Sequence, residues 1–318
     1  QDLHTSEIIW KRVLGENERL LFGQIYYWDS YNMHGAFAYL WTQVSTGSGA
    51  SAVTTWKAYD AFSGRWEFTI TNVPSGTTVR GPNGELQRLQ INLQNGWMAL
   101  WNSSAIISLA GSWRPYGNTY NASATSPASA LTAAERAWAW NVSIPKGLPG
   151  GVARILEDRV IGANALPFAG ARVDDFRTWG ISLKTEDRGR LLFDTSFRMP
   201  AGNLTLSFIT ASVEDRVFVM STKETRQTYG FNLDTGAKIW GPTQSQPYLD
   251  AYNIMAAGWQ GEVVAYGKLF RTATSGVVYA YDLKTGELLW SYDAKDHLTE
   301  ILWSDNWPLM VAFVADGK

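Results

Sequence analysis

The chain of 318 residues lacks, or is poor in, several features on which common functional classes depend. It contains no cysteine, which excludes disulfides, thiolate nucleophiles and zinc sites with sulfur ligands. Charged residues make up only 18% of the chain and the net charge is −2, which argues against a coiled coil, a disordered tail and a basic nucleic-acid-binding surface. No apolar run approaches the ~18–20 residues that a membrane helix needs.

Catalytic and cofactor motifs are scarce as well. The three histidines, His4, His34 and His297, are far apart and show no metal-ligand spacing. No G-x-S-x-G nucleophile motif and no glycine-rich phosphate loop occurs. The chain begins with Gln1 rather than methionine, and no signal peptide is visible. We therefore expect that a leader was removed or that the sequence is a piece of a longer protein.

Aromatic residues are abundant, and they include 16 tryptophans. Trp10, Trp240 and Trp290 belong to an internal repeat in which a polar residue precedes an aromatic residue by eight positions, with glycine or serine midway. The clear copies are Asp2 to Trp10, Asp60–Gly64–Phe68, Asn232–Gly236–Trp240 and Asp282–Gly286–Trp290, and degenerate copies end at Trp140 and Phe193.

The copy nearest the C-terminus predicts the structure of one repeat. Val277–Tyr281 alternates with the period of a strand, Asp282–Gly286 has the composition of a turn, and Glu287–Tyr292 predicts a second strand. Short strands at Glu262–Ala265 and Leu269–Thr272 complete a set of four. Four antiparallel strands repeated in this way predict a propeller blade, and one large aromatic per blade would fill the seam between neighbours.

The repeat therefore predicts an all-β fold with a single β-propeller domain over residues 1–318. We expect a partial blade at 1–12, five blades at about 18–72, 77–142, 150–195, 203–242 and 253–292, and a partial blade at 300–318. A long insert is expected at about 104–136. The two end pieces together lack two strands of a blade, which favours an incomplete segment of a 7- or 8-bladed ring. A six-bladed ring closed by pairing of the two termini is the alternative.

The string Val278–Trp290 resembles the repeat of quinoprotein β-propellers, the pyrroloquinoline quinone (PQQ) repeat family, and Phe231–Trp240 is similar to it. The family includes dehydrogenases and also non-catalytic members, such as outer-membrane assembly scaffolds and archaeal and bacterial surface proteins. The phrases Gly96–Ser104 and Trp140–Gly150 resemble the surface proteins. Quinone-dependent members typically clamp the quinone with adjacent cysteines, which this chain lacks. The resemblance therefore implies no cofactor, with PQQ and calcium as the alternative.

Several residues are candidates for a ligand site. Trp113 and Tyr116 lie in the insert and are candidates for an exposed platform for carbohydrate; the alternative is that they anchor the insert to the propeller. Trp10, Trp240 and Trp290 are expected in the seams. Asp174 and Asp175 are weak calcium candidates, and the pairs Glu157/Asp158 and Glu214/Asp215 are expected to be solvated turn residues. Glycosylation motifs occur at Asn102, Asn121, Asn141 and Asn203.

Together these observations predict a non-catalytic extracytoplasmic propeller, secreted, periplasmic or at the cell surface. It would serve as a binding or scaffolding module for a protein or carbohydrate ligand, and not for nucleic acid. A PQQ-dependent alcohol or aldose dehydrogenase is the first alternative. A carbohydrate-binding or carbohydrate-cleaving propeller is the second, and it predicts exposed aromatic residues with paired carboxylates nearby.

Overall fold

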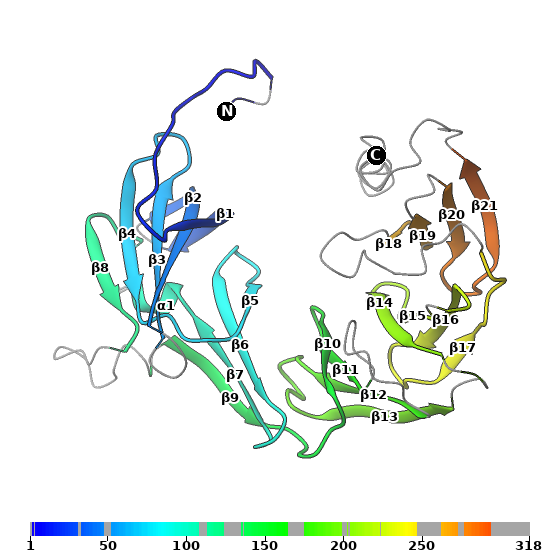
Figure 1. Cartoon of the computed structure of the whole chain (residues 1–318). Coiled ribbons are helices and arrows are strands. Elements are labelled where there is room, and N and C mark those ends of the chain that lie inside the picture. The colour runs from blue at the N-terminus through cyan, green and yellow to red at the C-terminus, as the bar shows by residue number, and fades with distance from the viewer. Residues whose placement is uncertain are drawn as a thin grey trace. The chain divides into compact units, whose positions relative to one another are not determined.

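The computed structural model describes residues 2, 4–30, 33–47, 52–107, 113–123, 135, 137–164, 175–198, 202, 204–222, 224–246, 262–272 and 277–293. In these residues the regular structure is almost entirely β, and strands adjacent in the chain pair into sheets (Figure 1). The chain divides into two compact units, residues 1–92 with 97–143, and residues 93–96 with 144–318. The fold is therefore all-β, as the alternation of the repeat predicts.

The first sheet of unit 1 holds five strands in the order β1-β2-β3-β4-β8 (Figure 1). Their bounds are β1 (Arg19–Ser30), β2 (Met33–Thr46), β3 (Val53–Asp60), β4 (Trp66–Thr71) and β8 (Asn118–Asn121). The first four strands run antiparallel, whereas β8 pairs with β4 in parallel, Phe68 opposite Asn118.

The second sheet of unit 1 has the order β5-β6-β7-β9. Its strands are β5 (Thr77–Arg80), β6 (Leu86–Asn92), β7 (Trp97–Asn102) and β9 (Trp138–Ser143), and the short helix α1 (Ser104–Ile107) follows β7. The predicted insert lies between β7 and β9. It contributes β8 to the first sheet, a long-range parallel pairing that the repeat does not predict.

The described part of unit 2 contains three four-stranded antiparallel sheets, each in chain order (Figure 1). The first consists of β10 (Gly151–Ile155), β11 (Arg159–Ala163), β12 (Asp175–Ser182) and β13 (Leu191–Arg198). The second consists of β14 (Leu206–Ser212), β15 (Val217–Thr222), β16 (Gln227–Asn232) and β17 (Lys238–Trp240). The third consists of β18 (Glu262–Ala265), β19 (Lys268–Thr272), β20 (Val277–Asp282) and β21 (Leu288–Asp293). This up-and-down order is that of a propeller blade. The partial blade predicted at 300–318 lies outside the described residues.

In three of the clear repeats the polar residue ends a strand and begins a tight turn. In the turn Asp282–Gly286, Asp282 Oδ1 accepts hydrogen bonds from the amides of Lys284 and Thr285 and from Thr285 Oγ1. These bonds, led by the one from the Thr285 amide, hold the pKa of Asp282 below its usual range. Gly286 has φ 73°, a value that glycine adopts at little cost.

The same turn recurs at Asp60–Gly64 and Asn232–Gly236, which together with Asp282–Gly286 we call the docking turns. A fourth copy begins at Asp2, whose Oδ1 accepts from the amides of His4 and Thr5, and ends at Ser6 with φ 61°. The local hydrogen bonds of the polar residue therefore define the turn, and the last position takes positive φ in every copy.

The aromatic residue that ends a repeat, which we call its closing aromatic, packs on a docking turn of the next sheet. Trp240 lies opposite Gly230 in its own sheet, and its Nε1 donates to the Leu283 carbonyl over 2.9 Å. A Cβ added at Gly286 would lie 2.4 Å from the Trp240 ring, and one at Gly230 would lie 2.0 Å from it. Glycine at both positions is therefore required for this close approach.

Phe193 and Trp10 pack in the same way. A Cβ at Gly236 would lie 2.5 Å from Phe193, and one at Gly64 would lie 2.6 Å from Trp10. Trp10 Nε1 also donates to the Ala61 carbonyl over 2.9 Å. The seam position predicted from the repeat is thus an aromatic ring seated on a turn glycine.

The two units have different cores. In unit 1, tryptophans pack edge to face. The ring centroids of Trp41 and Trp56 are 5.9 Å apart, and those of Trp56 and Trp101 are 6.1 Å apart. One core cluster of unit 2 consists mainly of phenylalanine and aliphatic residues around Phe218 and Phe231, and a second contains Trp240, Tyr279 and Tyr281. None of the helices in the described part of the chain has the length and apolar character that a membrane crossing requires.

Candidate ligand-binding site

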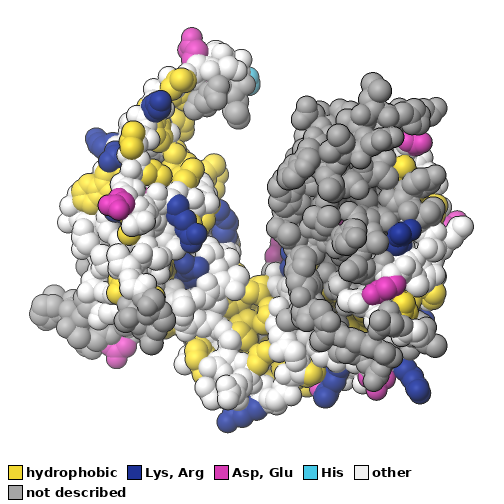
Figure 2. Space-filling model, viewed as in Figure 1, with side chains coloured by type: hydrophobic (Ala, Val, Ile, Leu, Met, Phe, Trp, Pro, Cys, Tyr) yellow, Lys and Arg dark blue, Asp and Glu magenta, His cyan; other side chains and the backbone are white. Residues whose placement is uncertain are grey.

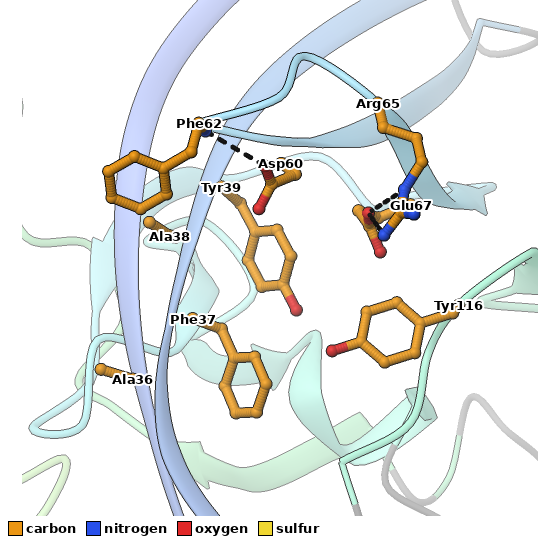
Figure 3. Close-up of a pocket in the computed structure, with 9 residues that line it drawn as sticks. All are labelled: Ala36, Phe37, Ala38, Tyr39, Asp60, Phe62, Arg65, Glu67 and Tyr116. Carbon is orange, nitrogen blue, oxygen red and sulfur yellow. Dashed lines mark hydrogen bonds and ion pairs between the residues drawn. The ribbon is translucent and has the colours of Figure 1, made fainter. Parts of the chain in front are cut away.

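A cavity of about 240 Å³ opens on the first sheet of unit 1 (Figure 3). It lies against β2, the docking turn Asp60–Gly64, the start of β4 and the segment before β8. Its lining residues are Ala36, Phe37, Ala38, Tyr39, Asp60, Phe62, Arg65, Glu67 and Tyr116. Figure 3 shows the phenol oxygens of Tyr39 and Tyr116 pointing into the space between them and Glu67.

The docking turn supplies the charged side of the cavity. The buried carboxylate of Glu67, 3% exposed, pairs with Arg65 at 3.0 Å, and the guanidinium of Arg65 lies toward solvent. Asp60 Oδ1 is held by the amides of Phe62 and Ser63 and by Ser63 Oγ. Two carboxylates and one guanidinium leave the cavity with a net charge of about −1.

Aromatic residues form the remaining walls. Phe62, at the tip of the docking turn, is 72% exposed, and Tyr116 is 47% exposed. Phe37 and Tyr39 on β2 stack with an interplanar angle of 5°. Trp113 lies behind Tyr39 and donates from Nε1 to the Tyr39 hydroxyl over 2.9 Å. The cavity thus combines exposed aromatic faces at its rim with a buried acid.

Both phenols act as hydroxyl groups at neutral pH. Burial raises the pKa of Tyr39 well above its usual value, although the hydrogen bond from Trp113 opposes the shift. Burial also raises the pKa of Tyr116. In contrast, burial would raise the pKa of Asp60, but the bonds from Ser63 and Phe62 outweigh it and lower the pKa. The cavity therefore presents two phenol groups beside an ionised carboxylate.

The structure separates the two residues of the predicted aromatic platform. Trp113 is only 3% exposed and packs against Tyr26, with ring centroids 4.4 Å apart, and against Phe68. Its ring is therefore unavailable to a ligand, which corrects the platform prediction for this residue. Trp113 anchors the insert instead, while Tyr116, three residues later, faces the cavity.

The other repeat aromatics occupy three environments. Phe68 is fully buried in the core of unit 1, where it contacts Tyr120 of β8. Trp140 is half-buried on β9, opposite Leu100. Trp290 on β21 is 44% exposed and lies near Phe270. In the described chain, a docking turn therefore covers the closing aromatic of some repeats and not of others.

The predicted acidic pairs are engaged in turns and ion pairs. Asp158 accepts from Arg159 and Arg216, and the hydrogen bond from Arg159 is the main cause that lowers the pKa of Asp158 to about 2. Asp215 accepts from Ser212, and Asp175 begins β12 in an exposed position. Asp174 lies outside the described residues. No group of three or more His, Cys, Asp or Glu residues that could hold a metal ion occurs in the described ranges.

The glycosylation motifs differ in exposure. Asn121 and Asn141 are exposed on β8 and β9, and Asn102 is half-buried at the end of β7. Asn102 and Asn121 also accept hydrogen bonds from backbone amides nearby. Asn203 lies outside the described residues.

Of the nine residues that line the cavity, sequence reasoning singled out only Asp60 and Tyr116 and missed the other seven, among them Tyr39, Phe62, Arg65 and Glu67. A signal was present in the docking turns. Where Asp60–Gly64 has Phe62, the other two turns have the charged residues Asp234 and Lys284. Where the repeat that begins at Asp60 has Glu67, those that begin at Asn232 and Asp282 have Ile239 and Leu289. Departures from the repeat therefore mark this cavity.

No protein-family model and no curated protein matches the chain. Solved structures that are similar to it include the computationally designed Ika8 protein, at 12% identity over 85% of this chain and 87% of that one, with a TM-score of 0.35. BamB from Moraxella catarrhalis is 12% identical over 81% of this chain and 71% of its own, with a TM-score of 0.35. A europium-containing methanol dehydrogenase is 12% identical over 87% of this chain and 53% of its own, with a TM-score of 0.35. The chain thus spans about half of that dehydrogenase.

Proposed function

We propose that the chain is a non-catalytic, extracytoplasmic carbohydrate-binding module and that the cavity on the first sheet of unit 1 holds one sugar ring. The observation that carries this proposal is the combination of the exposed rings of Phe62 and Tyr116 with the carboxylates of Asp60 and Glu67. A sugar ring has an apolar face that packs on aromatic rings and hydroxyl groups that bind carboxylates and phenols.

The charge and size of the cavity support a neutral polyol. Arg65 already neutralises Glu67, so a cationic ligand would meet a guanidinium at the mouth. Drug-sized ligands occupy ~300–1,000 Å³, so a cavity of about 240 Å³ suits one small ring with the rest of an oligosaccharide outside it. Hydroxyl groups can both donate to the carboxylates and accept from Tyr39, Tyr116 and Arg65.

The contacts of the two carboxylates favour binding over cleavage. Glycoside hydrolysis requires one carboxylic acid that stays protonated, with a raised pKa, beside a second that is ionised. Asp60 has a lowered pKa, which does not suit it to the role of proton donor. The carboxylate of Glu67 is already engaged with the Arg65 guanidinium.

A glycan array tests the proposal, followed by titration calorimetry with each saccharide that the chain retains. We expect the wild-type chain to retain specific saccharides and the affinity to fall about tenfold or more in Glu67→Gln and in Tyr116→Ala. The first change replaces the charged acceptor by a neutral amide, and the second removes a ring and its hydroxyl from the cavity. Tyr292→Ala is the matched control, since Tyr292 is exposed on β21 in unit 2.

Three outcomes would overturn the proposal. The first is a wild-type chain that retains no glycan on the array. The second is release of reducing ends from a bound saccharide, which would show cleavage. The third is reduction of an artificial electron acceptor with alcohol or aldose substrates after reconstitution with PQQ and calcium, which would favour the dehydrogenase alternative.

A further inference from the structure

We infer that Trp10 and Arg12 are positioning residues for this cavity, an inference that rests on the proposed function. They belong to the N-terminal segment, Glu7–Val13, which precedes β1. The segment exposes Ile8, Ile9 and Val13, and Figure 2 shows hydrophobic side chains along it. Apolar burial therefore holds this segment only weakly, and specific contacts with the sheet carry more weight.

Those contacts are made to the back of the docking turn Asp60–Gly64. Trp10 places its ring on Gly64 and donates from Nε1 to the Ala61 carbonyl over 2.9 Å. Arg12 donates from its guanidinium to the Gly64 carbonyl over 2.9 Å and lies 4.5 Å from the ring centroid of Tyr59. The two side chains thus bind the carbonyl groups of Ala61 and Gly64, which lie on either side of Phe62 in the chain.

Each of these carbonyls belongs to the peptide plane of a cavity residue. The Ala61 carbonyl and the Phe62 amide form one planar unit, and the Gly64 carbonyl and the Arg65 amide form another. Hydrogen bonds that orient these carbonyls therefore also orient the backbone from which Phe62 and Arg65 extend into the cavity. Within the described turn, two further hydrogen bonds restrain the same planes. The Phe62 amide donates to Asp60 over 3.1 Å, and the Arg65 amide donates to Ser63 over 3.3 Å.

A ligand that contacts Phe62 and Arg65 must order both side chains, and a preformed turn lowers that cost. Release of the N-terminal segment would raise the cost of ordering these side chains. The affinity at the cavity therefore depends on the contacts of Trp10 and Arg12 with the turn. Because such coupling is reciprocal, ligand binding also favours the docked segment. The N-terminal segment is therefore part of the binding site without touching the ligand.

Unit 2 offers a matched control for this inference. Trp240 packs on the turn Asp282–Gly286 and donates to the Leu283 carbonyl, just as Trp10 does to Ala61. The residue after Leu283 is Lys284, which reaches Asp215 at 3.9 Å and does not line the cavity. Removal of Trp240 breaks the same kind of contact away from the ligand.

The test compares Trp10→Ala, Trp10→Phe and Arg12→Gln with Trp240→Ala, using a saccharide retained on the array and amide hydrogen exchange. We expect affinity to fall about tenfold for Trp10→Ala, and less for Trp10→Phe, which keeps the ring but loses the donor. Arg12→Gln should weaken binding by a few-fold. The amides of Phe62 and Arg65 should exchange faster in these variants, while Trp240→Ala leaves both affinity and these amides unchanged.

The two readouts separate this inference from the proposed function. If the wild-type chain binds no saccharide, the proposed function fails, and faster exchange at Phe62 and Arg65 in Trp10→Ala alone still supports the positioning role. If Trp10→Ala leaves the exchange of these amides unchanged, or if it binds as tightly as the wild type, the inference is overturned. An equal loss of affinity in Trp240→Ala would also overturn it, because the effect would then be one of general stability.

Discussion

The docking turn of unit 1 and those of unit 2 have the same backbone and different surroundings. In unit 2 the middle residue of the turn is charged. Asp234 pairs with Arg216 of its own sheet and with Arg159 of the preceding sheet, and Lys284 approaches Asp215 of the preceding sheet at 3.9 Å. In unit 1 the same position is Phe62, which is exposed and lines a cavity.

This difference shows how a repeated element acquires a site. The hydrogen bonds of the polar residue keep the turn intact whatever its middle residue is, because they involve backbone amides. The middle residue is therefore free to join neighbouring sheets by an ion pair, as in unit 2, or to contact a ligand, as we propose for unit 1.

The outer strands differ in the same way. In unit 2, Trp240 is covered by the following turn and is 8% exposed. In unit 1, Phe68 is covered by β8, which the insert adds to the edge of β4. The insert thereby brings Tyr116 to the cavity, and the Gly117 amide donates to the Glu67 carbonyl over 2.7 Å. One insertion therefore caps the sheet and completes the site.

The largest effect is expected when the aromatic contact of unit 2 is removed. Trp240→Ala should lower the free energy of unfolding by about 3–5 kcal/mol, because a buried ring is lost and the glycine-lined space cannot collapse. Trp290→Ala, at the equivalent but 44% exposed position, should cost less than about 1 kcal/mol. Urea denaturation followed by fluorescence measures both, and equal costs would contradict the distinction.

A smaller, pH-dependent effect is expected in unit 1, where Glu18 ties the chain before β1 to the sheet. Burial alone would raise the pKa of Glu18, but hydrogen bonds from Lys57, Thr42 and Tyr59 outweigh it and lower the pKa to about 2. A carboxylate with a lowered pKa stabilises the fold above its unfolded pKa, and this stability is lost as the pH falls toward 2.

Glu18→Gln should therefore cost about 2–3 kcal/mol at pH 7 and much less near pH 2. Urea unfolding of both chains between pH 7 and pH 2 measures the difference. A cost that stays constant across this range would show that the charge of Glu18 is not what stabilises the contact.

The smallest effect on stability is expected at the position where the two kinds of docking turn differ. Phe62→Lys introduces the residue of the third docking turn at an exposed site, so the free energy of unfolding should change by less than about 0.5 kcal/mol. Affinity for a retained saccharide should fall about tenfold, since an aromatic face of the cavity is lost. Ile239→Lys, exposed on β17, is the control, and an equal loss of affinity there would contradict the assignment.

Much of the fold follows from short-range patterns. The alternation at Val277–Tyr281 and the turn residues after it predict a strand, a turn and a second strand, and the structure has β20 (Val277–Asp282) and β21 (Leu288–Asp293) there. The small residue opposite each closing aromatic is also visible in the sequence, two positions before the polar residue, as Gly230 and Ala280. Such features depend on residues that are close together in the chain.

The cavity could not be predicted in the same way. Trp113 and Tyr116 are three residues apart and equally aromatic, yet one is buried and the other is exposed. The difference arises because β8 pairs with β4, about 50 residues away in the chain, and this pairing turns Trp113 toward Tyr39. The chain before β8 also reaches Glu67, since the Gly117 amide donates to the Glu67 carbonyl.

The sequence by itself determined the all-β fold and the docking turns, because alternation and side-chain-to-backbone hydrogen bonds act over a few residues. It also placed aromatic residues where sheets could meet. Only the tertiary structure decided which of these aromatic rings are buried in the core and which face a cavity. Solvent exposure depends on the strands that pack against a residue, and these come from distant parts of the chain.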